Sequence, residues 1–285
     1  MGNSKLVTLN GDGYVLVIPD IHGNLYDFNR SVELFREYTK YYKPLYLVYL
    51  GDLIHGPTET TDGDDRLYGY KDESIEIIRS LIELKSELGD KLILLIGNHE
   101  YSHLSGKVTS KFHSNEAEYL ESKLGPSERE VFKQFFREFK LAVFAENGIV
   151  LCHGSPNILI DSLEKFSVLD FDCRNDDNLN EIIDSFIYNY GQSKEDTDKF
   201  LKNLSGLLNW ELRIVLHGHD KTRKGWYMEA DNQVCITCFG SPFYYRRYAF
   251  VDLSAIYKKN SDLVIDKEIR LLHKEYFDES KVLYK

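Results

Sequence analysis

Short apolar runs alternate with amphipathic segments through the first hundred residues. The runs at 14–18, 45–50 and 91–96 have the length of strands and, apart from Lys91, are apolar throughout. Between them, apolar residues recur at helical spacing: Phe28, Val32 and Phe35, then Ile75, Ile78 and Ile82. Strands without a polar face are expected to be covered on both sides. The pattern therefore predicts a βαβαβ start with right-handed crossovers.

The second half of the chain is less regular. Residues 115–139 have a helical pattern with a Gly-Pro-Ser break at 125–127, and a short strand is expected at 149–151. Three further strands are predicted at 214–216, 234–237 and 248–251. The mixed, acidic stretch 157–209 predicts a helical and irregular insertion. Without repeats or a linker rich in Pro, Gly or Ser, residues 1–285 are interpreted as one domain.

Polar side chains follow five of the predicted strands at the point where each strand ends. The segments PDIHGN, GDLIHGP, GNHE, CHGSP and HGHD carry Asp20, His22, Asp52, His55, Asn98, His99, His153, His217 and His219. Six of the nine histidines lie in these five segments, a concentration that chance placement does not explain. Ligands of open α/β sheets bind at the carboxyl ends of the strands. The five segments are therefore predicted to form one site.

Aspartate and histidine together suit divalent transition metals such as Mn, Fe or Zn. A carboxylate such as Asp52 can bridge two ions, and an ion pair can bind phosphate and activate water. Each residue alone has a structural explanation. Asp20 or Asp52 could cap a helix, Asn98 could be a turn residue, and His153 could be a hydrogen-bonded core histidine. Five coincidences would be needed to explain the whole set.

Charge and hydropathy narrow the expected partners. The net charge is −11, which makes the chain a poor binder of nucleic acid backbones, since these need clustered cations. No apolar run reaches the ~18 residues of a membrane span, and the amino-terminal segment lacks an apolar signal core. A cytoplasmic protein is the expectation. Composition does not predict the oligomeric state.

The ordered motifs resemble those of the calcineurin-like metallophosphoesterases, and more narrowly the phosphoprotein phosphatases. PDIHGN is similar to the family's GDxHG, GDLIHGP to GDxVDRG and CHGSP to CHGG, while GNHE matches outright. Near the end, His219 precedes Gly225 by six residues, as in the phosphatases, and a SAPNY-like strand end follows. The resemblance spans residues 14 to about 248 and is weakest in 157–209. It implies an α/β fold: a β-sandwich flanked by helices in four layers, αββα.

The resemblance also implies roles for single residues. One ion would be held by Asp20, His22 and Asp52. The second would be held by Asp52, Asn98, His153 and His219. His99 would protonate the leaving oxygen, and Tyr244 would lie beside the phosphate. His217 would support the metal ligands and, with Tyr244 and Arg246, is expected near the substrate phosphate. The implied activity is hydrolysis of phosphomonoesters, foremost of phosphoproteins or phosphopeptides, by a hydroxide that bridges two Mn, Fe or Zn ions.

The second motif departs from the family pattern. His55-Gly56-Pro57 replaces the Asp-Arg-Gly in which the aspartate orients the catalytic histidine and the arginine clamps phosphate. His55 is therefore the residue whose part in orienting His99 needs testing. The cations near the late motifs could take the arginine's place in binding phosphate: Arg246, Arg247, Arg223 and Lys221. A bidentate arginine is among the strongest ways to bind a phosphate, so its loss is expected to raise KM.

Two other functions stay open on the sequence. GDLIHGP is also similar to the GDLVARGP of dinucleoside polyphosphate hydrolases, but it is one residue short and lacks the arginine. The missing arginine also suits a metal-binding scaffold without activity. The presence of His99 argues against a scaffold, which would not need a proton donor.

Overall fold

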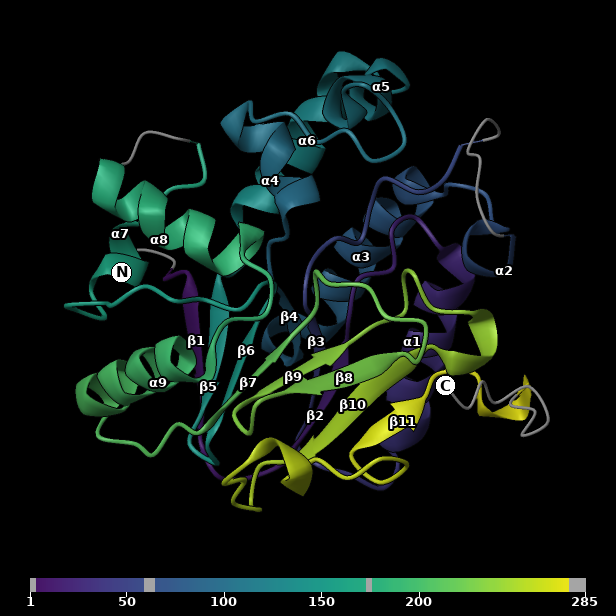
Figure 1. The fold of residues 1–285 in the computed structure, drawn as a ribbon. Helices are drawn as coiled ribbons and strands as arrows, with labels where there is room; N and C mark the ends of the chain where they lie inside the picture. Colours follow the sequence, from purple (N-terminus) through teal and green to yellow (C-terminus); the bar gives the residue numbers. More distant parts are fainter. Residues whose placement is uncertain (1–3, 59–64, 173–175, 277–285) are drawn as a thin grey trace.

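The computed structural model describes residues 4–58, 65–172 and 176–276 and contains two packed sheets (Figure 1). The six-stranded sheet has the order β1 (Leu6–Leu9), β5 (Ala142–Ala145), β6 (Ile149–Cys152), β7 (Ile214–His217), β9 (Gln233–Ile236), β8 (Trp226–Glu229). The five-stranded sheet has the order β11 (Ile269–Leu271), β10 (Arg247–Asp252), β2 (Tyr14–Ile18), β3 (Leu45–Tyr49), β4 (Leu92–Leu94). Strands β2, β3 and β4 are parallel, as are β6, β7 and β9.

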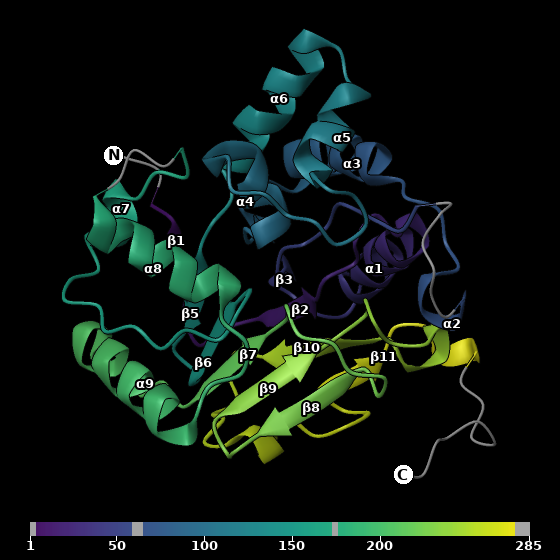
Figure 2. The same ribbon diagram turned by 45° about the horizontal axis from the view of Figure 1, so that its top comes forward.

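Helices cover both outer faces and one end of the sandwich. Figures 1 and 2 show α1 (Leu25–Tyr38) and α3 (Ser74–Leu88) beside the five-stranded sheet. They show α7 (Lys165–Val168), α8 (Asp177–Tyr188) and α9 (Lys194–Leu208) beside the six-stranded sheet. The remaining α-helices are α2 (Asp65–Tyr68), α4 (Asn98–Ser105), α5 (Glu116–Ser122) and α6 (Pro126–Arg137), and the last three lie together at one end. Single 3-10 turns are η1 (Gly89–Lys91), η2 (Phe243–Tyr245), η3 (Asn260–Asp262) and η4 (Lys274–Tyr276).

The side chains of strand β2 point alternately into two different hydrophobic cores. In β2, Val15 and Val17 pack into the core between the two sheets. Leu16 and Ile18 face the other way and pack with the core that contains Phe28 of α1. Successive side chains of a strand point to opposite faces, so a strand apolar throughout can bury both. Each buried aliphatic side chain contributes about 1.5–3 kcal/mol. The four-layer αββα architecture predicted through the family resemblance is confirmed.

The predicted strands are present, but they do not lie in one open sheet. The strands before the first three motifs are β2, β3 and β4, and those before the last two are β6 and β7, so the motifs come from both sheets. Four strands were not predicted: β1, β5, β8 and β11. They have three or four residues each, and three of them lie at sheet edges, so they leave little periodic signal. The expected insertion at 157–209 contains α7, α8 and α9.

No helix in the described part of the chain combines the length and the apolar character needed to cross a bilayer.

Candidate metal centre

The motif side chains meet at the carboxyl ends of strands from both sheets. Asp20 and His22 follow β2, Asp52 follows β3, and α4 begins at Asn98 beyond β4. His153 directly follows β6, and His219 lies two residues beyond β7. Because β2, β3 and β4 are parallel, and β6 is parallel to β7, their carboxyl ends come together. The predicted convergence of these segments on one site is present in the structure.

Asp52 is shared by two groups of metal-type ligands. One group contains His22, Asp52 and His99, and the other contains Asp52, His153 and His219, with ligand atoms within 4.8 Å of one another. Oδ2 of Asp52 lies 3.5 Å from Nε2 of His22 and 3.5 Å from Nε2 of His153. This buried oxygen has no hydrogen-bond partner among the described residues. An orphaned buried carboxylate oxygen between two imidazoles is suited to a cation.

The two histidines beside Asp52 are held with Nε2 facing it. Nδ1 of His22 lies 3.2 Å from the carbonyl oxygens of Ile54 and His55, and Nδ1 of His153 lies 3.0 Å from that of Leu50. A carbonyl oxygen only accepts, so each Nδ1 carries the hydrogen and each Nε2 keeps its lone pair. This is the usual arrangement behind metal-binding histidines.

The remaining predicted ligands complete the group around His153. Its Nε2 lies 3.2 Å from Oδ1 of Asn98 and 3.0 Å from Nδ1 of His219. The carboxylate of Asp20 lies nearby and accepts from the backbone N–H of His219 at 3.0 and 3.1 Å. All six predicted ligands therefore lie in one neighbourhood.

The electrostatics of this neighbourhood fit a bound cation. Burial, and next the nearby Asp52, raise the pKa of Asp20 well above its ordinary value. Burial raises the pKa of Asp52 to about 6 and lowers those of His153 and His219 to about 3 and about 2. Without a metal ion, the imidazoles of His153 and His219 therefore stay neutral, and burial disfavours the ionised form of Asp20 and Asp52 beside them. A metal ion binds deprotonated ligands, so the donor set fits such an ion.

The backbone at the site adopts an unusual conformation. Positive φ angles occur at His22 (42°), Asp52 (49°), His55 (64°) and His219 (66°). Residues with a Cβ rarely enter this region, and strained backbone concentrates at functional sites. The turns after three different strands are therefore bent, and in each of them at least one side chain, that of His22, Asp52 or His219, belongs to the ligand groups of the centre.

Glycines allow the motif loops to approach one another. A Cβ at Gly51 would lie 2.5 Å from the backbone nitrogen of Gly97, so the loops after β3 and β4 touch through their backbones. At Gly56, a Cβ would lie 2.7 Å from the carbonyl oxygen of His22 and 3.1 Å from Asp72. The space beside Gly56 is filled by these neighbours, so the backbone here leaves no room for the family's arginine.

Glu100, the last residue of the GNHE motif, joins two of the loops. Its carboxylate accepts the backbone N–H groups of Asp52 and Gly97 at 3.0 Å and of Leu53 at 2.8 Å. Burial and the charge of Asp52 raise the pKa of Glu100 to about 7 despite these bonds. Glu100 thus holds the Asp52 turn against the start of α4.

Lys111 is a residue of the site that the sequence analysis missed. It belongs to the connection between α4 and α5, and its Nζ lies 2.7 Å from Nε2 of His22. Burial lowers its pKa to about 8, and the charge of Asp52 acts in the opposite direction. A cationic side chain therefore stands beside a predicted metal ligand. Lysines in loops carry no periodic signal, so no pattern pointed to it.

A cavity of about 430 Å³ opens over the centre. Its lining comes from α4, the 108–111 connection and the segments after α8 and β7: Asn98, His99, Val108, Thr109, Ser110, Lys111, Tyr188, Tyr190, His219 and Lys221. Lys221 was one of the four cations named from the sequence. Lys111 and Lys221 both face the ring of Phe239, at 4.4 and 5.2 Å from its centroid. The cavity therefore brings two lysines to the candidate ligands.

The other predicted phosphate-binding residues lie in different surroundings. Arg246 is buried in an ion pair with Asp27, in which its Nη1 donates to both carboxylate oxygens at 2.9 and 3.0 Å. Arg247 pairs with Asp266 at 3.0 Å. Tyr244 belongs to η2, with its ring 4.8 Å from that of Tyr245.

His217 forms a group of its own beside the centre. Its Nδ1 lies 2.9 Å from the carbonyl oxygen of Gly218, and it belongs to a group of metal-type ligands with Asp220 and Cys235. The supporting role of His217 stays a prediction.

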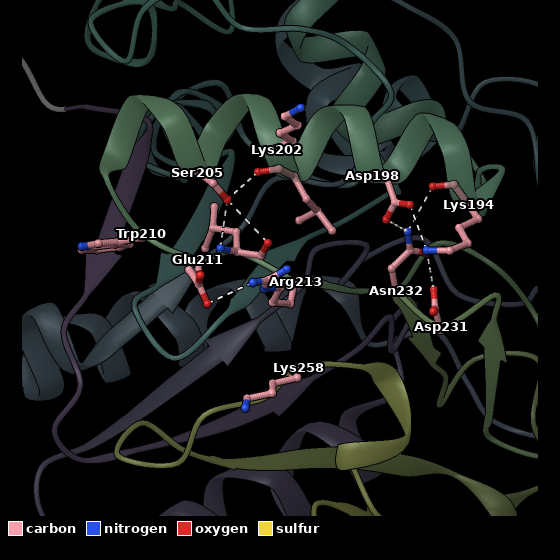
Figure 3. A pocket seen from close by; sticks show the side chains of 12 residues that line it. Lys194, Asp198, Lys202, Ser205, Trp210, Glu211, Arg213, Asp231, Asn232 and Lys258 are labelled. Atoms are coloured by element: carbon pink, nitrogen blue, oxygen red, sulfur yellow. Dashed lines mark hydrogen bonds and ion pairs between the residues drawn. The ribbon is translucent and has the colours of Figure 1, made fainter.

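A second cavity, of about 530 Å³, lies between α9 and the loop before β9 (Figure 3). Its charged side chains are largely paired with one another. Lys194 lies 2.8 Å from Asp198 and 2.8 Å from Asp231, and Arg213 lies 3.0 Å from Glu211. None of the motif residues lines it, so it is separate from the candidate centre.

Comparisons with known proteins agree with the geometry. A protein serine/threonine phosphatase from Saccharomyces cerevisiae, described as similar to human phosphatase PP5, has a TM-score of 0.56 and 21% identity, covering 82% of this chain and 70% of that chain. A cold-active protein-tyrosine phosphatase of a psychrophilic Shewanella species has a TM-score of 0.54 and 14% identity, covering 90% and 83%. These likenesses show the fold. The family model for calcineurin-like phosphoesterases matches residues 13–223, most of the chain, and this protein is therefore a member of that family.

Proposed function

We propose that the chain hydrolyses phosphomonoesters with two metal ions that share Asp52, and that its substrates are phosphoproteins or phosphopeptides. Membership of the family implies a metal-dependent hydrolase of phosphate esters. The observation that carries the proposal is the buried Oδ2 of Asp52, which faces Nε2 of both His22 and His153 at 3.5 Å and has no hydrogen bond within the described residues. A carboxylate placed in this way is suited to bridge two cations.

The ligands of the first ion would be Asp20, His22 and Asp52, and those of the second would be Asp52, Asn98, His153 and His219. Bound ions supply charge that polarises the phosphoryl group and lowers the pKa of water to around neutrality.

His99 supplies the proton for the leaving group in this proposal. Its Nε2 lies 3.8 Å from Oδ2 of Asp52, so the imidazole faces the centre. Its backbone N–H donates to Oδ1 of Asp52 at 3.0 Å, which ties its position to the shared ligand. A positioned histidine that delivers a proton typically contributes about 100- to 10,000-fold to a rate.

Lys111 and Lys221 bind the phosphate in place of the missing arginine. The lone pair of His22 Nε2 can bind either the ammonium of Lys111 or a metal ion, so metal binding would release Lys111 toward an anion in the cavity. Two lysines beside the cavity supply the positive charge that Gly56 cannot. A lysine binds phosphate as a point charge without the fixed geometry of arginine, so a weaker and less selective hold is expected.

The protein substrate is supported by the two solved phosphatases that share the fold and act on proteins by their description. The cavity is also open at the surface beside two tyrosines, Tyr188 and Tyr190, which can pack against a peptide.

The test is the turnover of three substrates by Mn²⁺-loaded protein: an aryl phosphate, a phosphopeptide and a dinucleoside tetraphosphate. We expect the first two to be hydrolysed, with loss of activity on chelation and at least a 1,000-fold fall in Asp52→Asn. Faster turnover of the dinucleotide would favour the polyphosphate hydrolase. If no substrate is turned over and Asp52→Asn still abolishes Mn²⁺ binding, the chain is a metal-binding scaffold.

A further inference from the structure

His55 contacts His99 directly, although it replaces the aspartate of the family motif. Nδ1 of His55 lies 2.9 Å from Nδ1 of His99, and both side chains are buried. The backbone N–H of His55 donates to Oγ of Ser74 at 2.8 Å, which fixes the turn. An imidazole therefore stands where the family pattern expects a carboxylate.

Two more side chains extend this hydrogen-bonded contact from His55 away from the candidate metal centre. Nε2 of His55 lies 3.0 Å from Nε2 of His103, and Nδ1 of His103 lies 2.9 Å from Oε1 of Glu121. His99 and His103 are four residues apart on α4 and so lie on the same face of the helix. Glu121 of α5 is itself paired with Lys133 of α6 at 3.0 Å. Three imidazoles and one carboxylate thus form a continuous chain.

The chemistry of the last residue sets the direction of every hydrogen bond. A carboxylate only accepts, so Nδ1 of His103 donates to Glu121 and Nε2 of neutral His103 accepts. His55 must then donate from Nε2 and accept at Nδ1. His99 must therefore donate from its own Nδ1, which leaves Nε2 as the nitrogen that faces Asp52.

The protonation states agree with this direction. Burial lowers the pKa of His103, so this imidazole is neutral near pH 7. Burial acts to raise the pKa of Glu121, but hydrogen bonds from His103 and Lys133 hold it below its ordinary value.

A second acceptor faces the same nitrogen of His99. Oε2 of Glu116 lies 3.3 Å from Nδ1 of His99, is buried, and makes no hydrogen bond within the described residues. The other oxygen of Glu116 accepts the backbone N–H of Phe112 at 2.9 Å, which fixes the carboxylate in place. Both neighbours of Nδ1 thus favour a hydrogen on that nitrogen.

We propose that His55, His103 and Glu121 form a positioning chain, aided by Glu116, that holds His99 in the Nδ1–H tautomer with Nε2 facing the reaction centre. The chain replaces the single carboxylate that the family motif supplies from the second strand. This inference rests on the proposed function only for its effect on the rate, because the tautomer can be measured without a substrate. In a serine protease, the wrong tautomer of the catalytic histidine costs about 10,000-fold in kcat.

The test uses His103→Phe, which keeps a ring against Phe136 and removes both hydrogen bonds. Glu121→Gln is the second variant, in case His103→Phe does not fold. His113→Phe is the matched control, because His113 stacks on Tyr119 of the same region and lies outside the chain.

The first readout is the ring-nitrogen spectrum of His99 in protein labelled with ¹⁵N-histidine, without metal and with Zn²⁺. We expect the Nδ1–H form in the wild type and in His113→Phe, and a mixture of tautomers in His103→Phe and Glu121→Gln. An Nε2–H form in the wild type, or an unchanged tautomer in both variants, would overturn the proposal even if the protein proves to be an active phosphatase.

The second readout compares substrates with different leaving groups. Proton donation matters most when the leaving group is poor. We expect kcat for a phosphoserine peptide to fall about 10- to 100-fold in His103→Phe, while kcat for dinitrophenyl phosphate falls less than threefold and KM hardly changes. Equal losses on both substrates would mean that His103 is only structural. Absence of turnover in the wild type would refute the proposed function and leave the tautomer result standing.

Discussion

Replacing Asp52 by asparagine should abolish activity and yet stabilise the metal-free protein. Asparagine tolerates the positive φ of 49° at this position, and its oxygen can accept the His99 N–H as the aspartate does. Its amide NH₂ would face the lone pair of His153, where the aspartate places an oxygen without a partner. The lone pair of His22 already faces the ammonium of Lys111. The substitution therefore turns the unfavourable contact with His153 into a hydrogen bond.

The size of the effect follows from the pKa of Asp52. Burial raises this pKa from 3.8 to about 6, and the free energy equivalent of this change is roughly 3 kcal/mol. Because the folded-state pKa is the higher one, the folded protein binds more protons between pH 4 and 6, and stability falls as the pH rises through that window. The destabilisation is complete above about pH 6 and absent below about pH 4. We therefore expect Asp52→Asn to gain about 1–3 kcal/mol at pH 7.5 and little at pH 4.5.

The assay is thermal unfolding with a chelator at both pH values. A gain of this size corresponds to an increase of several degrees in Tm for a chain of this length. Added Mn²⁺ should raise the Tm of the wild type and not that of Asp52→Asn, because only the folded wild type binds the ion tightly. A chelated variant that is less stable than the wild type at pH 7.5, or that gains the same stability at both pH values, would contradict this expectation.

Two further predictions concern the cations. Lys111→Met should lower kcat/KM for phosphate esters about 10- to 100-fold, mainly through KM, since a hydrogen bond to a charged group contributes about 1.5–3 kcal/mol. Lys123→Met, outside the cavity, is its control. An unchanged KM of Lys111→Met in steady-state kinetics would show that Lys111 does not bind the phosphate. Arg246→Met should destabilise the fold by about 3–5 kcal/mol in chemical unfolding, because it leaves Asp27 buried without its arginine, while KM stays constant. If Arg246→Met instead had a higher KM and unchanged stability, Arg246 would be a substrate-binding residue.

The motifs could be located from sequence because each depends on local structure. A buried strand, a glycine turn and a polar residue occur within a few positions, and the turn residues with positive φ, such as His22 and Asp52, are part of those motifs. The same local logic predicted helices α1 and α3 from their apolar spacing. The order of these units along the chain was enough to indicate the family and its four layers.

The residues that surround His99 and line the cavity could not be found in this way. Lys111, His103, Glu116 and Glu121 lie on α4, on α5 and in the connection between them, and no motif contains them. Their spacing resembles that of ordinary surface residues, and they reach the site only because α4 and α5 pack over the carboxyl ends of the strands. The sequence also did not predict that strands of two different sheets contribute to one centre, because local periodicity does not show which strands pair.

By itself, therefore, the sequence determined the candidate ligands, because the geometry of a strand end and its turn is set within a few residues. Tertiary structure alone decided which side chains surround His99 and line the cavity, where the second motif lacks the family's aspartate and arginine. Hydrogen bonds and charges act through space over a few ångströms. They can join His55 to His103, 48 residues further along the chain, only once the fold has brought the two imidazoles to 3.0 Å.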